Sequence, residues 1–121
     1  MDLGLKGKKV ILTGGSRGIG RAALEIFAAE GCDIAFFSRN SEQVAQAAAS
    51  LVRHCGKVFG EAFSIDDMAG YPGWLERAAD QLGGCDIFVP GASASGAGAT
   101  GDWQVCFNSD VLGTVRGCET L

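Results

Sequence analysis

The chain has 121 residues, 47% of them hydrophobic and 20% charged, with a formal net charge of −4. This balance indicates one globular domain and excludes a disordered or fibrous chain. Lysine and arginine form no cluster, so nucleic acid is not expected as a partner. No apolar run approaches the roughly 18 residues of a membrane span, and the first residues lack a secretory signal, so we expect no membrane association and a cytoplasmic location.

Five cysteines and one histidine are the candidate soft metal ligands of the chain. The cysteines form no C-x-x-C pair and lie in apolar segments, which favours reduced, mostly buried thiols in a reducing compartment. His54 is the one residue of another ligand type near the cysteines, so no metal site is predicted. The sequence also places no catalytic partner beside His54. The cysteines are Cys32, Cys55, Cys85, Cys106 and Cys118.

The first third of the chain predicts a strand, a turn, a helix and a second strand. An apolar run over residues 9–12 ends in TGG, which indicates a buried strand that enters a tight turn. The following residues have helical periodicity up to Gly31. A second apolar run, over residues 33–38, lacks polar alternation, as expected for a parallel strand covered on both faces. The residues expected on the buried face of the helix are Ile19, Ala22, Ala23, Ile26 and Phe27.

The middle of the chain predicts two further helices separated by a weak strand. Asn40 can cap the first helix, and Asp66 and Asp67 are expected to cap the second. The strand covers residues 58–63 and is interrupted by Gly60. The apolar residues expected to line the helices are Val44, Ala48, Leu51, Val52 and Cys55 in the first, and Tyr71, Leu75, Ala78, Ala79 and Leu82 in the second.

The last third predicts one more strand and one more helix. Pro72 fits the first turn of the preceding helix and Gly83 ends it. Residues 85–90 form an apolar strand, and the glycine-rich GASASGAGATG that follows is expected to be flexible without ligand. Residues 103–121 predict a helix, weakened by two glycines, whose apolar stripe contains Phe107, Val111, Val115 and Cys118. Alternating strands and helices predict an α/β fold with a parallel sheet covered on both faces.

The segment TGGSRGIG, residues 13–20, lies between the first strand and the first helix. Glycines at such a turn allow positive φ and let a pyrophosphate approach the main chain, while the N–H groups and dipole of the helix start favour an anion. A dinucleotide is therefore the expected ligand. The alternative is a turn that uses its glycines only for tight packing.

The spacing of Thr13, Gly14, Gly18 and Gly20 resembles the TGxxxGxG signature of the short-chain dehydrogenases/reductases. The similarity continues through DIFVPGAS at 86–93, which aligns with the fourth strand and NNAG motif of that family, and through DVLG at 110–113, which aligns with NxxG. The resemblance implies the N-terminal portion of a Rossmann-type, doubly wound parallel sheet, with strands one to four in the order 3-2-1-4.

The resemblance also implies a set of cofactor-binding positions. In this family the turn after the first strand binds the pyrophosphate, residues after the third strand contact the adenine, and residues after the fourth approach the adenosine ribose. Thr13 is expected to brace the turn. The implied binding residues are Gly14, Ser16, Gly18, Ile19 and Gly20 at the turn, Ser64 and Ile65 after the third strand, and Gly91 and Ala92 after the fourth.

The end of the second strand bears on the choice of nicotinamide cofactor. NAD-binding versions of this fold place an acid there to hold the ribose 2′-hydroxyl. This sequence has Ser38 followed by Arg39, and Arg17 lies in the glycine turn, so two guanidinium groups could flank a 2′-phosphate. NADP is therefore favoured over NAD. Each arginine alone is also compatible with a solvated side chain, and Asn40 suits helix capping as well as a cofactor hydrogen bond.

The sequence departs from the family pattern at three places. PGAS at 90–93 replaces NNAG, so the asparagine side chains that tie the central sheet together are missing. Asp110 replaces the family's catalytic asparagine, which helps hold a water in a proton relay through a local distortion of the helix; the alternative is a solvated helix acid. Tyr71, the one tyrosine, is followed four positions later by Leu75, so no YxxxK motif exists.

The resemblance thus implies an NADP(H)-dependent oxidoreductase acting on a small carbonyl or alcohol substrate. Residues 1–121 are interpreted as its NAD(P)-binding Rossmann domain, truncated before the catalytic serine and the YxxxK motif and inactive alone. Family members commonly dimerise through the helix that starts near Trp103, which implies a homo-oligomer. The alternative is a non-catalytic NADP(H)-binding or scaffolding protein.

Overall fold

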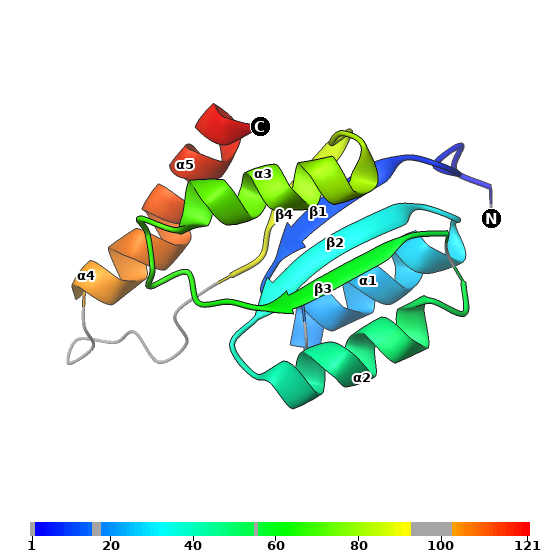
Figure 1. Ribbon diagram of the computed structural model, residues 1–121, viewed down its shortest axis with the longest axis horizontal. Helices are drawn as coiled ribbons and strands as arrows, with labels where there is room; N and C mark the ends of the chain where they lie inside the picture. The colour runs from blue at the N-terminus through cyan, green and yellow to red at the C-terminus, as the bar shows by residue number, and fades with distance from the viewer. Residues whose placement is uncertain (1, 16–17, 55, 93–102) are drawn as a thin grey trace.

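A four-stranded parallel sheet with the order β3-β2-β1-β4 forms the centre of the folded molecule (Figure 1). The computed structural model describes residues 2–15, 18–54, 56–92 and 103–121. The strand order and the parallel pairing confirm the predicted Rossmann-type α/β fold. The strands are β1 (Lys9–Thr13), β2 (Asp33–Ser38), β3 (Val58–Ala62) and β4 (Ile87–Pro90). The helices are α1 (Gly18–Ala29), α2 (Ser41–Leu51), α3 (Tyr71–Leu82), α4 (Trp103–Cys106), the π-helix η1 (Phe107–Leu112) and α5 (Gly113–Thr120).

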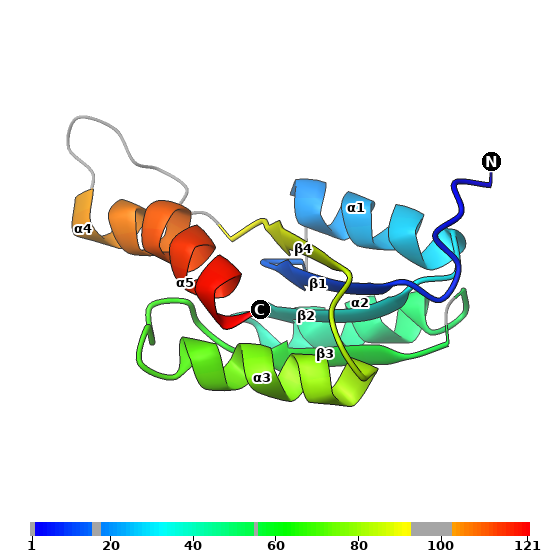
Figure 2. The same cartoon turned by 90° about the horizontal axis from the view of Figure 1, so that it is seen from above.

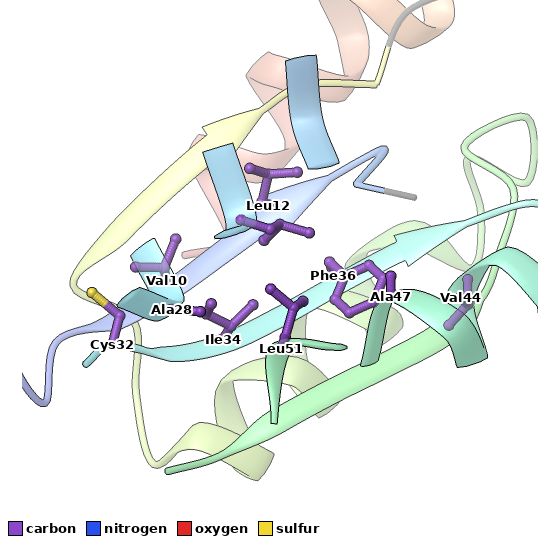
Figure 3. Close-up of a cluster of buried hydrophobic side chains, with 10 residues drawn as sticks. Val10, Leu12, Ala28, Cys32, Ile34, Phe36, Val44, Ala47 and Leu51 are labelled. Atoms are coloured by element: carbon purple, nitrogen blue, oxygen red, sulfur yellow. The ribbon is translucent and has the colours of Figure 1, made fainter. Parts of the chain in front are cut away.

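The helices cover both faces of the sheet. Figure 2 shows α1 and α3 on opposite sides of it, and α2 packs beside α1 while α5 packs against α3 and β4. Because side chains alternate along a strand, β1 directs Val10 and Leu12 toward α1 and α2, and Ile11 toward α3. The side chains between the sheet and the helices α1 and α2 form one buried cluster, which Figure 3 shows and to which Ile34 and Phe36 of β2 also belong. Because helices bury both faces of β1 and β2, these strands do not alternate apolar with polar residues.

Helix boundaries follow the predicted signals at most positions. The Asn40 side chain accepts a hydrogen bond from the N–H of Gln43 at 3.0 Å and caps α2. Pro72 lies in the first turn of α3, and Gly83 ends that helix with φ of +82°. The capping prediction for Asp66 and Asp67 was wrong, because α3 begins after Gly70 and has no side-chain cap. Asp67 instead closes a turn before the helix, where its Oδ1 accepts the N–H of Gly70.

The predicted buried face of α1 was wrong in part, since Ala23 and Phe27 pack half-buried against the core. Ile19 is 90% exposed and Ile26 is 62% exposed, whereas Leu24 and Ala28 are fully buried. The reason is the close approach of the helix to the glycine turn, since a Cβ on Gly20 would lie 2.5 Å from the Gly14 carbonyl oxygen. This approach turns the face containing Gly20, Leu24 and Ala28 toward the sheet. Ile19 and Ile26 lie outside this face and are exposed.

The predicted faces of α2 and α3 are largely confirmed. Among the predicted residues, Val44 and Leu51 of α2 are buried, Val52 is exposed, and Cys55 lies outside the described residues. The predicted residues of α3 are buried or half-buried, and Trp74, which was not predicted, is also fully buried. The buried residues of α3 are Tyr71, Trp74, Leu75, Ala78 and Leu82.

The C-terminal helical segment packs through its smallest residues. The predicted apolar stripe is exposed, with Phe107, Val111 and Val115 between 42% and 47% accessible. The buried positions are Ser109, Gly113 and Gly117, spaced four residues apart. Because a Cβ on Gly117 would overlap the Phe88 ring, the absence of a side chain at Gly117 lets the helix lie directly on β4. The stripe therefore faces away from this contact.

The cysteine prediction holds in part. Cys32 is buried, Cys85 and Cys106 are half-buried, and Cys118 is exposed, which contradicts the prediction for that residue. Burial raises the pKa of the Cys32 and Cys85 thiols, which keeps them protonated and weakly nucleophilic. In the part of the chain that the structure describes, no group of three His, Cys, Asp or Glu side chains could hold a metal ion. No helix in that part is long and apolar enough to cross a membrane.

Candidate nucleotide-binding site

The glycine turn between β1 and α1 is held tightly against the end of β4. Gly14 has φ of +78°, and a Cβ at this position would lie 2.8 Å from the Ala92 Cα and 3.2 Å from the Gly91 carbonyl oxygen. On the other side of the turn, Gly15 is buried beneath Leu24. Only a residue without a side chain fits at Gly14, so this glycine is needed both for its left-handed backbone and for the close approach of two strands.

Gly18 is exposed at the start of α1. It has φ of +63°, and among the described residues no atom outside its chain neighbours lies within 4 Å of a Cβ built at this position. The first turn of α1 contains no acidic residue, so no carboxylate opposes the positive end of the helix dipole. Ile19 is exposed beside Gly18, while the predicted site residues Ser16 and Arg17 lie outside the described residues. An anionic group can therefore approach the main chain at this position.

Thr13 braces the carboxyl ends of β1 and β4, as expected. Its side chain is buried, and its Oγ1 accepts a hydrogen bond from the Ala92 N–H at 3.1 Å. A Cβ on Gly91 would lie 2.7 Å from the Thr13 carbonyl oxygen, so the backbones are in close contact here. The Thr13 hydroxyl thus supplies a connection between central strands in a sequence that lacks the asparagines of NNAG.

The carboxyl ends of β2 and β3 lie side by side, because Ser38 pairs with Ala62 in parallel register. Ser38 is half-buried and Arg39 is exposed. The Arg39 Nη1 lies 3.9 Å from the Asp66 Oδ2, which makes an ion pair across the two loops. The Asn40 side-chain oxygen is engaged in capping α2, which is the alternative that its position left open.

The loop after β3 connects the predicted adenine-contacting residues to the C-terminal helical segment. The Ser64 Oγ accepts the N–H of Asp66 at 3.2 Å, which shapes the loop. Ile65 packs onto the helix at Gly113, where a Cβ would lie 2.7 Å from the Ile65 Cδ1. The loop and the helix that carries Asp110 are therefore in direct contact.

Asp110 lies in a local distortion of the helix, as the resemblance implied. Residues Phe107–Leu112 form a π-helix, and the N–H of Gly113 donates to the Asn108 carbonyl oxygen five residues earlier. The Asp110 side chain is exposed, and its main-chain carbonyl oxygen accepts a hydrogen bond from the Thr114 hydroxyl at 3.1 Å. A π-helix leaves carbonyl groups without their usual partners and is frequent at functional sites.

Tyr71 has a structural role in this part of the molecule. Its fully buried hydroxyl donates to the Gly113 carbonyl oxygen at 2.9 Å and so ties α3 to the helix immediately after the π-helix. Burial raises the pKa of Tyr71 to about 12. A hydroxyl that is buried, engaged and this weakly acidic is unsuited to donate a proton to a substrate.

Two contributions to this region were missed in the sequence. The packing of Gly15 against Leu24 could have been inferred from the second glycine that directly follows Gly14. Hydrophobic periodicity instead placed other residues of α1 on the buried face. The pairing of Arg39 with Asp66 had no signal, because residues 27 positions apart meet only through the register of β2 and β3.

Comparisons with known proteins identify the same family along the chain. The family model for short chain dehydrogenase matches residues 8–121. The chain is 31% identical to isoepoxydon dehydrogenase of Penicillium expansum, in a match that covers 96% of this chain and 46% of that enzyme. It is 28% identical to the 3-oxoacyl-(acyl-carrier-protein) reductase of Chlamydia pneumoniae, with 100% of this chain and 51% of the reductase covered.

A solved structure extends the similarity to three dimensions. The crystal structure of L-sorbose reductase from Gluconobacter frateurii, complexed with NADPH and L-sorbose, superposes with a TM-score of 0.88 at 32% identity. The match covers 100% of this chain and 48% of the reductase. The chain thus spans about half the length of the relatives it matches. With the family model matched over residues 8–121, the chain belongs to the short-chain dehydrogenase/reductase family.

Proposed function

We propose that this chain is the cofactor-binding part, residues 1–121, of an NADP(H)-dependent oxidoreductase that acts on a small carbonyl or alcohol substrate. The observation that carries the proposal is the glycine turn, which Thr13 ties to Ala92 and which leaves Gly18 exposed at the start of α1. Gly14, Gly18, Ile19 and Gly20 would hold the pyrophosphate there, together with Ser16, while Arg17 would join Arg39 at the 2′-phosphate. When bound, the nicotinamide supplies or accepts a hydride, which no side chain can do.

The preference for NADP is supported by the residues at the end of β2. Ser38 occupies the position of the acid that would repel a 2′-phosphate, and the exposed Arg39 guanidinium can donate two parallel hydrogen bonds to phosphate oxygens. Ser64 and Ile65 would contact the adenine, and Gly91 and Ala92 the adenosine ribose. The similar L-sorbose reductase was crystallised in complex with NADPH, which makes the same cofactor reasonable here.

Asp110 is proposed to help hold a water near the reacting carbonyl. The Asp110 carbonyl oxygen has two lone pairs, so it can accept a water in addition to the Thr114 hydroxyl. The proton donor for the substrate would have to come from outside these residues, because Tyr71 is buried and no YxxxK motif exists. A homo-oligomer is also proposed, since a second copy could cover the exposed apolar residues Phe107, Val111 and Val115.

The cofactor proposal predicts that the full protein binds NADPH more tightly than NADH. Arg39→Asp should weaken NADPH binding by about 1.4 kcal/mol or more, roughly tenfold, because a charge-assisted hydrogen bond is replaced by repulsion. NADH binding should change much less. Isothermal titration calorimetry of both cofactors against both proteins measures these affinities. Equal affinities of the wild-type protein for NADPH and NADH would remove the basis for the NADP assignment.

The role of Asp110 predicts different results for two substitutions in the full enzyme. Asp110→Asn should retain activity, because asparagine keeps a short polar side chain and the helix distortion. Asp110→Leu should lower kcat about tenfold, a modest loss for a proton-relay group. Steady-state kinetics with NADPH and circular dichroism, as a check on folding, provide the test. Normal turnover by the leucine variant would show that the Asp110 side chain is a surface acid without a role in activity, since the main-chain carbonyl oxygen is still present in that variant.

A further inference from the structure

The ion pair between Arg39 and Asp66 brings a carboxylate to the residue expected to bind the 2′-phosphate. The Nη1–Oδ2 distance is 3.9 Å, and the two side chains are 72% and 54% exposed. The position of Asp66 is fixed by its own loop, since its N–H donates to the Ser64 Oγ and the next N–H, of Asp67, donates to the Ser64 carbonyl oxygen. These hydrogen bonds hold the main chain at Asp66, from which the carboxylate reaches Arg39.

We propose that Asp66 is a specificity-determining residue that reduces the preference for NADPH over NADH. The inference rests on the proposed assignment of Arg39 to the 2′-phosphate. A phosphate that binds Arg39 approaches a second negative charge, so Asp66 repels the phosphate and competes with it for the same guanidinium. NADH carries a 2′-hydroxyl at this place and is not subject to that repulsion.

The geometry favours competition over a supporting role for Asp66. An acid that oriented Arg39 for phosphate binding would hold the guanidinium by short hydrogen bonds, typically about 2.7 to 2.9 Å between charged groups. At 3.9 Å the pair is electrostatic without a hydrogen bond, and both side chains are mostly exposed. Such a pair does little to fix the Arg39 rotamer. Its main effect on an incoming phosphate is charge.

The chain offers a matched control at the next residue. Asp67 carries the same charge and is also exposed, but its Oδ1 accepts the N–H of Gly70 at 3.0 Å and so belongs to the turn before α3. Asp67→Asn changes the net charge as much as Asp66→Asn does, and asparagine can still accept the Gly70 hydrogen bond. A difference between the two variants therefore measures position rather than net charge.

The test is a titration of NADPH and NADH against the full wild-type protein, Asp66→Asn and Asp67→Asn at low salt and at about 0.5 M salt. Asp66→Asn should bind NADPH roughly two- to fivefold more tightly, as expected for one screened charge removed, and NADH unchanged. Asp67→Asn should change neither affinity. The gain should shrink at high salt, because exposed charges are then screened. An unchanged or weaker NADPH affinity in Asp66→Asn, or an equal gain in Asp67→Asn, would overturn the proposal.

A third variant separates this inference from the cofactor assignment on which it rests. Arg39→Gln should weaken NADPH binding if Arg39 holds the 2′-phosphate. If wild-type protein does not prefer NADPH and Arg39→Gln changes neither affinity, the cofactor assignment fails and the inference falls with it. If Arg39→Gln weakens NADPH binding but Asp66→Asn leaves it unchanged, only the role of Asp66 is wrong.

Discussion

Gly14→Ala should lower the free energy of unfolding by more than about 3 kcal/mol and abolish binding of NADPH. An L-residue in the left-handed region, where Gly14 has φ of +78°, costs roughly 1 to 2 kcal/mol. The new Cβ would also lie 2.8 Å from the Ala92 Cα and 3.0 Å from its nitrogen, which are main-chain atoms that no rotamer change can move. Relief requires separation of β1 from β4, which also breaks the Thr13–Ala92 hydrogen bond.

Gly18→Ala is the control for backbone strain alone. Gly18 has a similar φ of +63°, but in the described parts of the chain no atom beyond its neighbours lies within 4 Å of the added Cβ. Gly18→Ala should therefore lower the free energy of unfolding only by the roughly 1 to 2 kcal/mol that the left-handed backbone conformation costs. Urea unfolding of both variants gives the two free energies. Equal losses would show that the contact with Ala92 contributes nothing and that only the conformation of Gly14 matters.

Gly117→Ala should destabilise the protein by about 2 to 3 kcal/mol, although alanine is the better helix former by roughly 0.5 to 1 kcal/mol. The added Cβ would overlap the rigid Phe88 ring and lie 3.1 Å from the Tyr71 hydroxyl oxygen. The helix would have to move away from β4, and this movement would strain the hydrogen bond from Tyr71 to Gly113. Thermal unfolding followed by circular dichroism measures the loss.

Gly73→Ala provides the opposite expectation in another helix. Gly73 lies in α3, and its added Cβ would meet the Arg77 Nη1 at 3.9 Å, an ordinary contact with a flexible side chain. Alanine should therefore stabilise the protein here by up to about 1 kcal/mol. If Gly117→Ala and Gly73→Ala shifted the midpoint of thermal unfolding in the same direction, the contact of Gly117 with Phe88 would not determine the effect of the added methyl group.

The sheet could be predicted from the sequence because its signals are local. Apolar runs identified β1, β2 and β4, and a weaker run interrupted by Gly60 identified β3. Asn40, Pro72 and Gly83 marked helix ends through hydrogen bonds and backbone angles that depend on near neighbours. The strand order was predicted from the family resemblance, which rests on the TGxxxGxG spacing and not on hydrophobic periodicity.

The buried face of the C-terminal helical segment, and part of that of α1, could not be predicted from periodicity. α1 contacts the glycine turn closely at Gly20, and α5 contacts Phe88 of β4 closely at Gly117. Ile19 and Val115, which are close to these glycines in sequence, are exposed. Hydrophobic periodicity gives weight to isoleucine and phenylalanine and gives none to glycine. The face is instead set by which backbone can approach most closely, a property of two elements together.

The candidate site shows the same division. The turn and the Thr13 brace follow from a motif, whereas the ion pair between Arg39 and Asp66 depends on the register of β2 with β3. Asn40 illustrates a residue with two possible roles in the sequence, of which the helix cap is the one found. Loop contacts of this kind require the three-dimensional arrangement.

The Thr13–Ala92 hydrogen bond has a consequence for the order of folding. The two residues are 79 positions apart, while β1 and β2 are joined by a single helix. Because closing a longer loop costs more chain entropy, the β1–β4 contact should form after the β1–β2 pair. The cofactor turn is then incomplete until β4 docks, so a dinucleotide that binds the finished turn selects molecules in which the last strand is in place. Refolding in the presence of cofactor should therefore give a higher yield of native protein, through the linkage between ligand binding and folding.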